Sequence, residues 1–301
     1  IKPVPSRGGF FNSFVNCDSS LHASLEYFVL RQSVFFASDK AECVCARVHD
    51  ARRPAPSGAF FQNQGCSTGS KLYGATNMMI TLASVLNPAQ LQHARDLLRS
   101  APFVDGKLSA GSAAARVKNN LEVARNAPEL DALNDVVMNS LVRHPVYRAA
   151  AFPLRVAAPY YARYTPGMAY GEHVDDPIMG IEGMPYRCDI AVTIFLNPDS
   201  DYDGGELAVR TAFGIQRVKL PAGDAILYPA ASLHHVTPVT RGERLVAVTW
   251  LQSAVRDPAR RELLYELHLA REKLLQTAPD AVETAQVSRS YVNLVRMWSE
   301  V

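Results

Sequence analysis

The sequence lacks any run of about 18 apolar residues, the length that a helix needs to cross a bilayer. A membrane-spanning helix is therefore not expected. The start of the chain, Ile1-Lys-Pro-Val-Pro5, also lacks the charged and then apolar pattern of a secretory signal. Together these absences predict a cytoplasmic protein without a membrane partner.

An excess of charge of one sign is missing as well. The chain has 31 Lys and Arg against 29 Asp and Glu, a net charge of +2, and its basic residues are scattered. Proteins that bind nucleic-acid phosphates usually show a basic patch or stripe, so no nucleic-acid partner is expected. With 301 residues, 48% of them hydrophobic, the chain can form one large domain with an appendage.

Cysteine is scarce, and four of the five cysteines precede residue 78. An odd number without a secretory signal does not indicate structural disulfides. Cys43-Val-Cys45 has neither the spacing nor the partners of a zinc motif. Cys188 is expected to be a small buried apolar residue rather than a nucleophile.

The motifs of several enzyme classes are absent, namely a Ser/His/Asp or Cys/His triad pattern, a phosphate loop and a dinucleotide fingerprint. The sequence does contain His173-Val-Asp175. Side chains alternate between the faces of a strand, so His173 and Asp175 can point to the same place. A further imidazole would complete the set of two histidines and one carboxylate that is typical of non-haem Fe(II) oxygenases.

The third ligand of such a site is His234 or His235, which lie about sixty residues later. Because adjacent residues of a strand face opposite sides, only one of them can face a metal, and spacing alone does not choose. The carboxylate is less ambiguous, since Asp175 fits the His-x-Asp spacing and Asp176 does not.

Composition and periodicity divide the chain into three parts. Residues 1–77 show no sustained period, apart from a short helical stretch at 21–34, and are predicted to be a poorly ordered extension or to lie outside the natural protein. The alternative is a regulatory or targeting extension. Residues 78–255 are predicted to form the working domain, and 256–301 a helical segment.

Within the working domain, helices are expected near 87–98 and 129–142, separated by a Gly/Ser/Ala-rich loop at 103–115. His144 precedes a proline and is expected to cap a helix or lie on the surface. Short strands separated by turns predict an antiparallel sandwich or barrel, and hence an α+β fold. These strands are expected at 80–85, 156–163, 189–196, 206–211, 216–220, 224–228, 235–239 and 244–251. The apolar faces of the two C-terminal helices are expected to pack onto this domain.

Four motifs then support a resemblance to a known family. They are Tyr164-x-x-Gly-x-x-Tyr170-x-x-His173-x-Asp175, Asp203-Gly-Gly-Glu-Leu207, Ser232-Leu-His234-x-Val-Thr-Pro-Val and Arg241-Gly-Glu-Arg244. In these motifs the sequence resembles the prolyl-hydroxylase-like Fe(II)/2-oxoglutarate dioxygenases. It is more narrowly similar to the bacterial PKHD-type hydroxylases linked to iron uptake, a likeness that includes Val117-Lys-Asn-Asn120 and extends over about residues 79–300.

The resemblance implies a double-stranded β-helix, or jelly roll, with Fe(II) as cofactor and 2-oxoglutarate as cosubstrate, and also ascorbate binding. It implies that His173, Asp175 and His234 ligate iron, which places the third ligand at His234. Arg244 would pair with the distal carboxylate of 2-oxoglutarate through its bidentate guanidinium, and the Tyr164 hydroxyl would contact the same carboxylate. The implied reaction is hydroxylation of a peptide, amino-acid-like or siderophore-like substrate with decarboxylation of 2-oxoglutarate to succinate, linked to iron homeostasis.

Three further expectations concern the surroundings of this site. If Arg244 points inward, then Val246, Val248 and Trp250 do too, forming apolar walls that strengthen an Arg–carboxylate attraction. The segment 176–187 is expected to be a mobile lid or, alternatively, a tightly packed crossover loop. The C-terminal helices could form the face of a homodimer.

Two other classes of function use the same residues. A non-catalytic sensor would bind iron and 2-oxoglutarate without turnover. A zinc hydrolase would use two histidines and one aspartate to hold a metal-bound water. Release of succinate that depends on Fe(II), O2 and 2-oxoglutarate separates the dioxygenase from both.

Overall fold

The computed structural model describes residues 78–181 and 183–301. The extension predicted for residues 1–77, with its helical stretch at 21–34, lies outside the described residues. In the described part, no helix combines the length and the apolar character that a membrane crossing requires.

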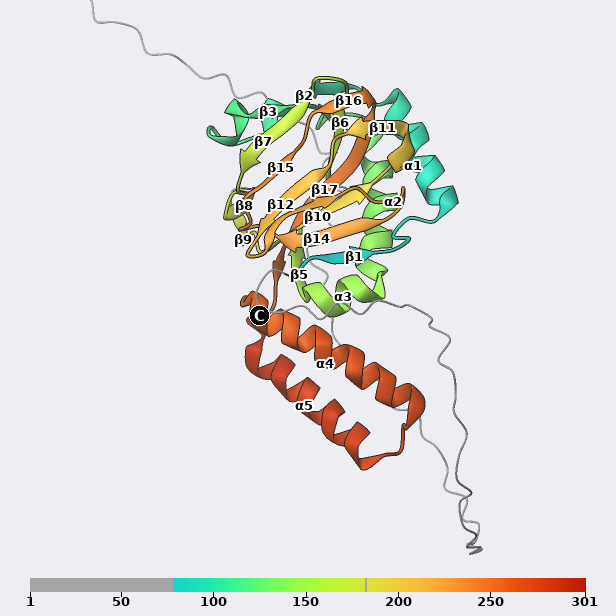
Figure 1. Ribbon diagram of the computed structural model, residues 1–301, viewed down its shortest axis with the longest axis vertical. Helices are drawn as coiled ribbons and strands as arrows, with labels where there is room; N and C mark the ends of the chain where they lie inside the picture. The colour runs from blue at the N-terminus through green and yellow to red at the C-terminus, as the bar shows by residue number, and fades with distance from the viewer. Residues whose placement is uncertain (1–77, 182) are drawn as a thin grey trace, which may run out of the picture.

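Two antiparallel sheets form the body of the fold (Figure 1). The larger, eight-stranded sheet contains β1 (Ile80–Leu82), β14 (Ala225–Pro229), β10 (Ile190–Phe195), β17 (Arg244–Ser253), β6 (Tyr160–Tyr164), β4 (Leu121–Val123) and β2 (Phe103–Asp105) in this order, with β5 (Pro153–Val156) paired to β17. The smaller, five-stranded sheet has the order β13 (Gly214–Val218), β12 (Leu207–Thr211), β15 (His234–Val236), β7 (Ala169–His173) and β3 (Lys118–Asn119). Two short pairs complete the strands, β11 (Tyr202–Gly204) with β16 (Val239–Gly242) and β8 (Ile178–Ile181) with β9 (Met184–Arg187).

The two sheets share one hydrophobic core, which includes Ala162 and Val246 from the larger sheet and Val209 and Val236 from the smaller one. This sandwich of facing antiparallel sheets is the double-stranded β-helix, or jelly roll, and the predicted α+β fold class is confirmed. Strand β10 was predicted to be a buried strand, and all six of its residues are buried.

Helices α1 (Pro88–Ser100), α2 (Leu130–Arg143) and α3 (Pro145–Ala151) cover the other face of the larger sheet (Figure 1). Their side chains pack in a second core against residues such as Ile194 and Ala247. Helix α1 begins where the sequence predicts, with Asn87 as its N-cap and a proline at its first position, and Asn87 and Gln90 form a reciprocal capping box.

Several local predictions were incomplete. The segment 103–115 was predicted as a loop, but it contains β2, the 3-10 helix η2 (Gly106–Ser109) and the start of the 3-10 helix η3 (Ala114–Arg116). His144 is the predicted cap, yet it also begins α3, a helix that was not predicted, by accepting a hydrogen bond from the Tyr147 amide. The segment 176–187 was expected to be a lid or a crossover loop, whereas β8 and β9 pair there as a hairpin.

The C-terminal helices α4 (Pro258–Thr277) and α5 (Val282–Trp298) form a hairpin that projects from the end of the sandwich (Figure 1). They pack mainly on each other, and α4 also contacts α3. The prediction that their apolar faces pack onto the domain is confirmed in part for α4, which contacts α3 and buries Leu264, and is wrong for α5, which packs mainly on α4. The predicted boundary at residue 255 and the predicted homodimer face stay predictions.

Candidate metal centre

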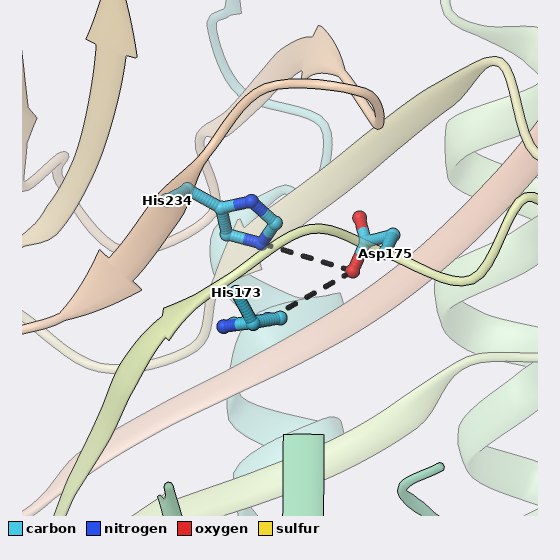
Figure 2. Close-up of side chains that lie close together, drawn as sticks. All are labelled: His173, Asp175 and His234. Atoms are coloured by element: carbon cyan, nitrogen blue, oxygen red, sulfur yellow. Dashed lines mark ion pairs between the residues drawn. The ribbon is translucent and has the colours of Figure 1, made fainter. Parts of the chain in front are cut away.

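Three side chains of the smaller sheet and the turn beside it converge on one point (Figure 2). His173 ends β7 and His234 begins β15, and the two are direct partners across these antiparallel strands. Asp175 follows His173 by two residues, just beyond the end of β7. Its Oδ1 lies 3.9 Å from His173 Nε2 and 3.7 Å from His234 Nε2, and one ligand atom from each of the three lies within 4.8 Å of the others.

Each imidazole in this cluster is oriented by a backbone carbonyl. The Nδ1 of His173 lies 2.8 Å from the Gly171 oxygen, and the Nδ1 of His234 lies 2.9 Å from the Ser232 oxygen. A carbonyl can only accept, so both Nδ1 atoms carry a hydrogen, which leaves Nε2 as the atom that each ring can offer to a metal. Such an outer hydrogen bond is usual for histidines that ligate metals.

The protonation states also suit a cation. Burial, together with the neighbouring His234, lowers the pKa of His173 to about 4, so the ring is neutral near pH 7. Burial raises the pKa of Asp175, and its Oδ2 has no hydrogen-bond partner among the described residues. A bound cation would favour the charged form of this carboxyl. Two imidazoles and one carboxylate are a donor set that fits Fe(II).

Burial favours one residue in each pair of alternatives that spacing left open. His234 is buried and faces the cluster, whereas the neighbouring His235 is partly exposed. Asp176 is exposed, while the Asp175 side chain is buried. Cys188 is buried as predicted, and burial raises the pKa of its thiol.

A second feature is the guanidinium of Arg244, which is only 1% exposed. Arg244 begins β17 directly opposite Tyr164 on β6, and its Cζ lies 5.0 Å from the Tyr164 ring and 5.8 Å from the Phe195 ring. Its Nε has no hydrogen-bond partner in the described part of the chain. A buried charge is costly unless it is paired, so this group fits an anionic ligand such as a carboxylate.

Strand β17 has the predicted alternation. Val246, Val248 and Trp250 belong with Tyr164 to the core between the sheets, whereas Leu245, Ala247 and Leu251 belong to the core under the helices. Arg244 therefore shares its face with three apolar side chains, as expected. Burial raises the pKa of Tyr164 to about 12, so its hydroxyl remains protonated and can donate a hydrogen bond.

Sequence reasoning missed other residues of the site. The Tyr170 ring stacks on His173 with a centroid distance of 3.7 Å, and the Tyr228 ring lies edge-on to His234 at 5.1 Å. Lys118 and Glu122 form a buried ion pair nearby. Lys118 was named from the sequence only as part of the motif Val117-Lys-Asn-Asn120, to which no role was assigned.

Comparison with known protein families agrees with this geometry. The family described as "2OG-Fe(II) oxygenase superfamily" matches residues 159–252, and "PKHD-type hydroxylase C-terminal domain" matches residues 258–300. The PKHD-type hydroxylase Tgr7_2199 of Thioalkalivibrio sulfidiphilus is 52% identical over 224 residues, which are 74% of this chain and 100% of that protein. The chain belongs to the PKHD-type hydroxylase family. This PKHD-type hydroxylase is accordingly an enzyme that depends on Fe(II) and 2-oxoglutarate.

Other similar proteins are more distant. A PKHD-type hydroxylase of Hyphomonas neptunium is 43% identical over 228 residues, covering 74% of this chain and 100% of that protein. Among solved structures, a prolyl hydroxylase from Trichoplax adhaerens in complex with a hypoxia inducible factor peptide fragment matches with a TM-score of 0.42 and 18% identity, over 62% of this chain and 86% of that one.

Proposed function

We propose that this PKHD-type hydroxylase holds Fe(II) through His173, Asp175 and His234 and binds the distal carboxylate of 2-oxoglutarate through Arg244 and Tyr164. The observation that carries the assignment is the buried cluster of two Nε2 atoms and one carboxylate oxygen within 4.8 Å of one another. A buried guanidinium without a partner at its Nε, on the wall of the same core, supports the second half of it.

Each of these residues has a defined task. The two histidines point their Nε2 atoms at the cluster, because backbone carbonyls accept hydrogen bonds from their Nδ1 atoms, and Asp175 supplies the negative charge. Arg244 orients one end of the cosubstrate, while Val246 and Val248 keep water from the pair and so strengthen it. With iron, 2-oxoglutarate and O2 bound, the centre supplies the oxidative decarboxylation of 2-oxoglutarate to succinate and CO2, coupled to insertion of one oxygen atom into a substrate C–H bond.

The class of substrate is also part of this proposal. We infer a peptide, an amino-acid-like compound or a siderophore-like small molecule, with a role in iron homeostasis, because the motifs of the chain are those of the prolyl-hydroxylase-like enzymes. Ascorbate would serve as the reductant that keeps the iron ferrous.

Succinate release tests the assignment. The wild-type enzyme should release succinate only when Fe(II), O2 and 2-oxoglutarate are all present. Asp175→Ala should abolish both release and Fe(II) binding, whereas Asp176→Ala, one residue away and exposed, should retain both. Binding of 2-oxoglutarate without release would instead indicate a sensor, and turnover that ignores 2-oxoglutarate would indicate a zinc hydrolase. Full activity in Asp175→Ala would refute the ligand assignment.

A further inference from the structure

The segment Lys118–Val123 crosses from one sheet to the other beside the metal centre. Its first two residues form β3 and pair with β7 in the smaller sheet, and its last three form β4 and pair with β6 in the larger one. Asn120 lies at the crossing. One short piece of chain therefore joins both layers along an edge of the sandwich, next to the strand that ends in His173.

Lys118 and Glu122 close this edge with an ion pair between the two sheets. Lys118 Nζ lies 2.5 Å from Glu122 Oε1, and both side chains are 8% exposed. The same ammonium donates to the Ser109 hydroxyl at 2.8 Å. Burying an ion pair costs desolvation energy that a pair of apolar side chains of similar volume would avoid. Stability alone therefore does not account for charges at this place.

A chain of contacts leads from the ammonium to a metal ligand. Lys118 is the direct strand partner of Tyr170, and its Nζ lies 5.3 Å from the centroid of that ring. Tyr170 in turn stacks on the His173 imidazole at 3.7 Å, with 14° between the ring planes. Tyr170 and His173 are three residues apart and would face opposite sides in a regular strand. An irregularity in the pairing of β7 with β15 lets both rings face the interior.

We propose that Lys118 is a positioning residue for the metal centre, acting through Tyr170 on His173, and that Glu122 makes its charge tolerable in the interior. The ammonium fixes the Tyr170 ring by a cation–π contact, and the ring fixes the plane of the imidazole. The inference rests on the proposed role of His173 as an iron ligand. It also assigns a role to the motif Val117-Lys-Asn-Asn120, which contains none of the proposed iron or 2-oxoglutarate ligands.

Paired variants separate positioning from stability. Lys118→Met keeps the aliphatic stem but leaves Glu122 buried without its cation, so Tm of the metal-free protein should fall. Lys118→Met with Glu122→Gln removes both charges and should recover Tm. Affinity for Co(II), followed by its d–d absorption without any turnover, should fall about tenfold in both variants, the lower end of the loss seen when groups that orient metal ligands are removed. Lys118→Arg keeps the charge and should bind Co(II) almost normally.

Recovery of both Tm and Co(II) affinity in the double variant would show that Lys118 is only structural and would overturn the proposal. The contact through the Tyr170 ring is tested by adding Lys118→Met and Glu122→Gln to a Tyr170→Leu variant. In that variant the added substitutions should leave Co(II) affinity unchanged. A further tenfold loss would show that Lys118 does not act through Tyr170. Arg210→Met with Glu172→Gln removes an exposed ion pair, 3.0 Å apart, that links β12 to β7, and should leave Co(II) affinity unchanged.

Asp175→Ala separates a failure of this inference from a failure of the proposed function. Loss of Co(II) binding in Asp175→Ala together with normal binding in the Lys118/Glu122 double variant would refute only the role of Lys118. Normal Co(II) binding in Asp175→Ala would refute the proposed metal site itself.

Discussion

Arg244 and Tyr164 lie directly opposite each other on neighbouring antiparallel strands, and both are buried in the core between the sheets. Each side chain therefore presents a polar group to an interior that is otherwise largely apolar. The proposed site for the distal carboxylate of 2-oxoglutarate can therefore be tested by changing Arg244 or Tyr164 alone.

Replacing Arg244 by Lys should weaken binding of 2-oxoglutarate while leaving metal affinity intact. Lysine keeps the charge but loses the bidentate fork, and loss of such a buried contact costs about 2 kcal/mol, or roughly thirtyfold in Kd. Calorimetric titration of 2-oxoglutarate into the anaerobic Fe(II) enzyme measures this change. Arg241→Lys, a few residues away and paired with Asp203 on the surface, is the matched control. Equal effects of the two variants would contradict the assignment.

Tyr164→Phe removes one hydroxyl and should raise the Kd for 2-oxoglutarate several-fold. A single neutral hydrogen bond is worth about 1 kcal/mol, so the loss should be smaller than for Arg244→Lys. The same titration measures it. An unchanged Kd would show that the hydroxyl does not contact the carboxylate.

The two adjacent histidines provide a comparison within one strand. His234→Ala should abolish stable Fe(II) binding, since it removes one of three ligand atoms, whereas His235→Ala should bind the metal normally. Metal content after dialysis and Co(II) absorption measure the outcome. The opposite result would place the ligand at His235 and would require β15 to be shifted by one residue.

The metal-free protein should lose stability as the pH falls from about 6.5 to about 4. Since burial lowers the pKa of His173 to about 4, the unfolded chain binds a proton at this position in that range and the folded chain does not. The contribution is on the order of 3 kcal/mol at neutral pH. Burial of Asp175 acts in the opposite direction, because it raises the pKa of that carboxyl.

Comparison with His173→Gln isolates the histidine. Urea unfolding between pH 4 and 7 should give a shallower dependence on pH for the variant than for the wild type. Identical slopes would mean that His173 is not held neutral by its surroundings.

Gly205→Ala should disturb the Arg244 site. Gly205 has a φ of +65°, and an added Cβ would lie 3.1 Å from Arg244 Cδ. Gly167, with a φ of +86°, has no atom within 4 Å of such a Cβ, so Gly167→Ala carries only the backbone strain of about 1–3 kcal/mol. Both variants should lower Tm, but only Gly205→Ala should also raise the Kd for 2-oxoglutarate.

Periodicity and short motifs predicted the parts of the site that depend on a single strand. The inward face of Arg244 follows from the alternation of side chains along a strand. The His-x-Asp motif indicated Asp175, although β7 ends at His173 and the aspartate lies just beyond it. The Asn87 cap and the buried character of β10 could also be predicted locally, because each depends on neighbouring residues.

Features that depend on pairing between distant segments could not be predicted. The Lys118–Glu122 pair forms because the two sheets meet at Asn120. In the sequence the two residues are four positions apart, a spacing that by itself suggests neighbours on one turn of a helix. The stacking of Tyr170 on His173 depends on an irregular register that no local pattern signals. The C-terminal helices have helical apolar periodicity, but periodicity does not say whether the partner is the domain or the other helix.

Strand β17 separates two cores, with alternate residues facing the core under the helices and the core between the sheets. The residues that face the helices can therefore preserve thermal robustness while those that share the face of Arg244 diverge. Sequence changes that alter the proposed cosubstrate site are accordingly expected at every second position of this one strand.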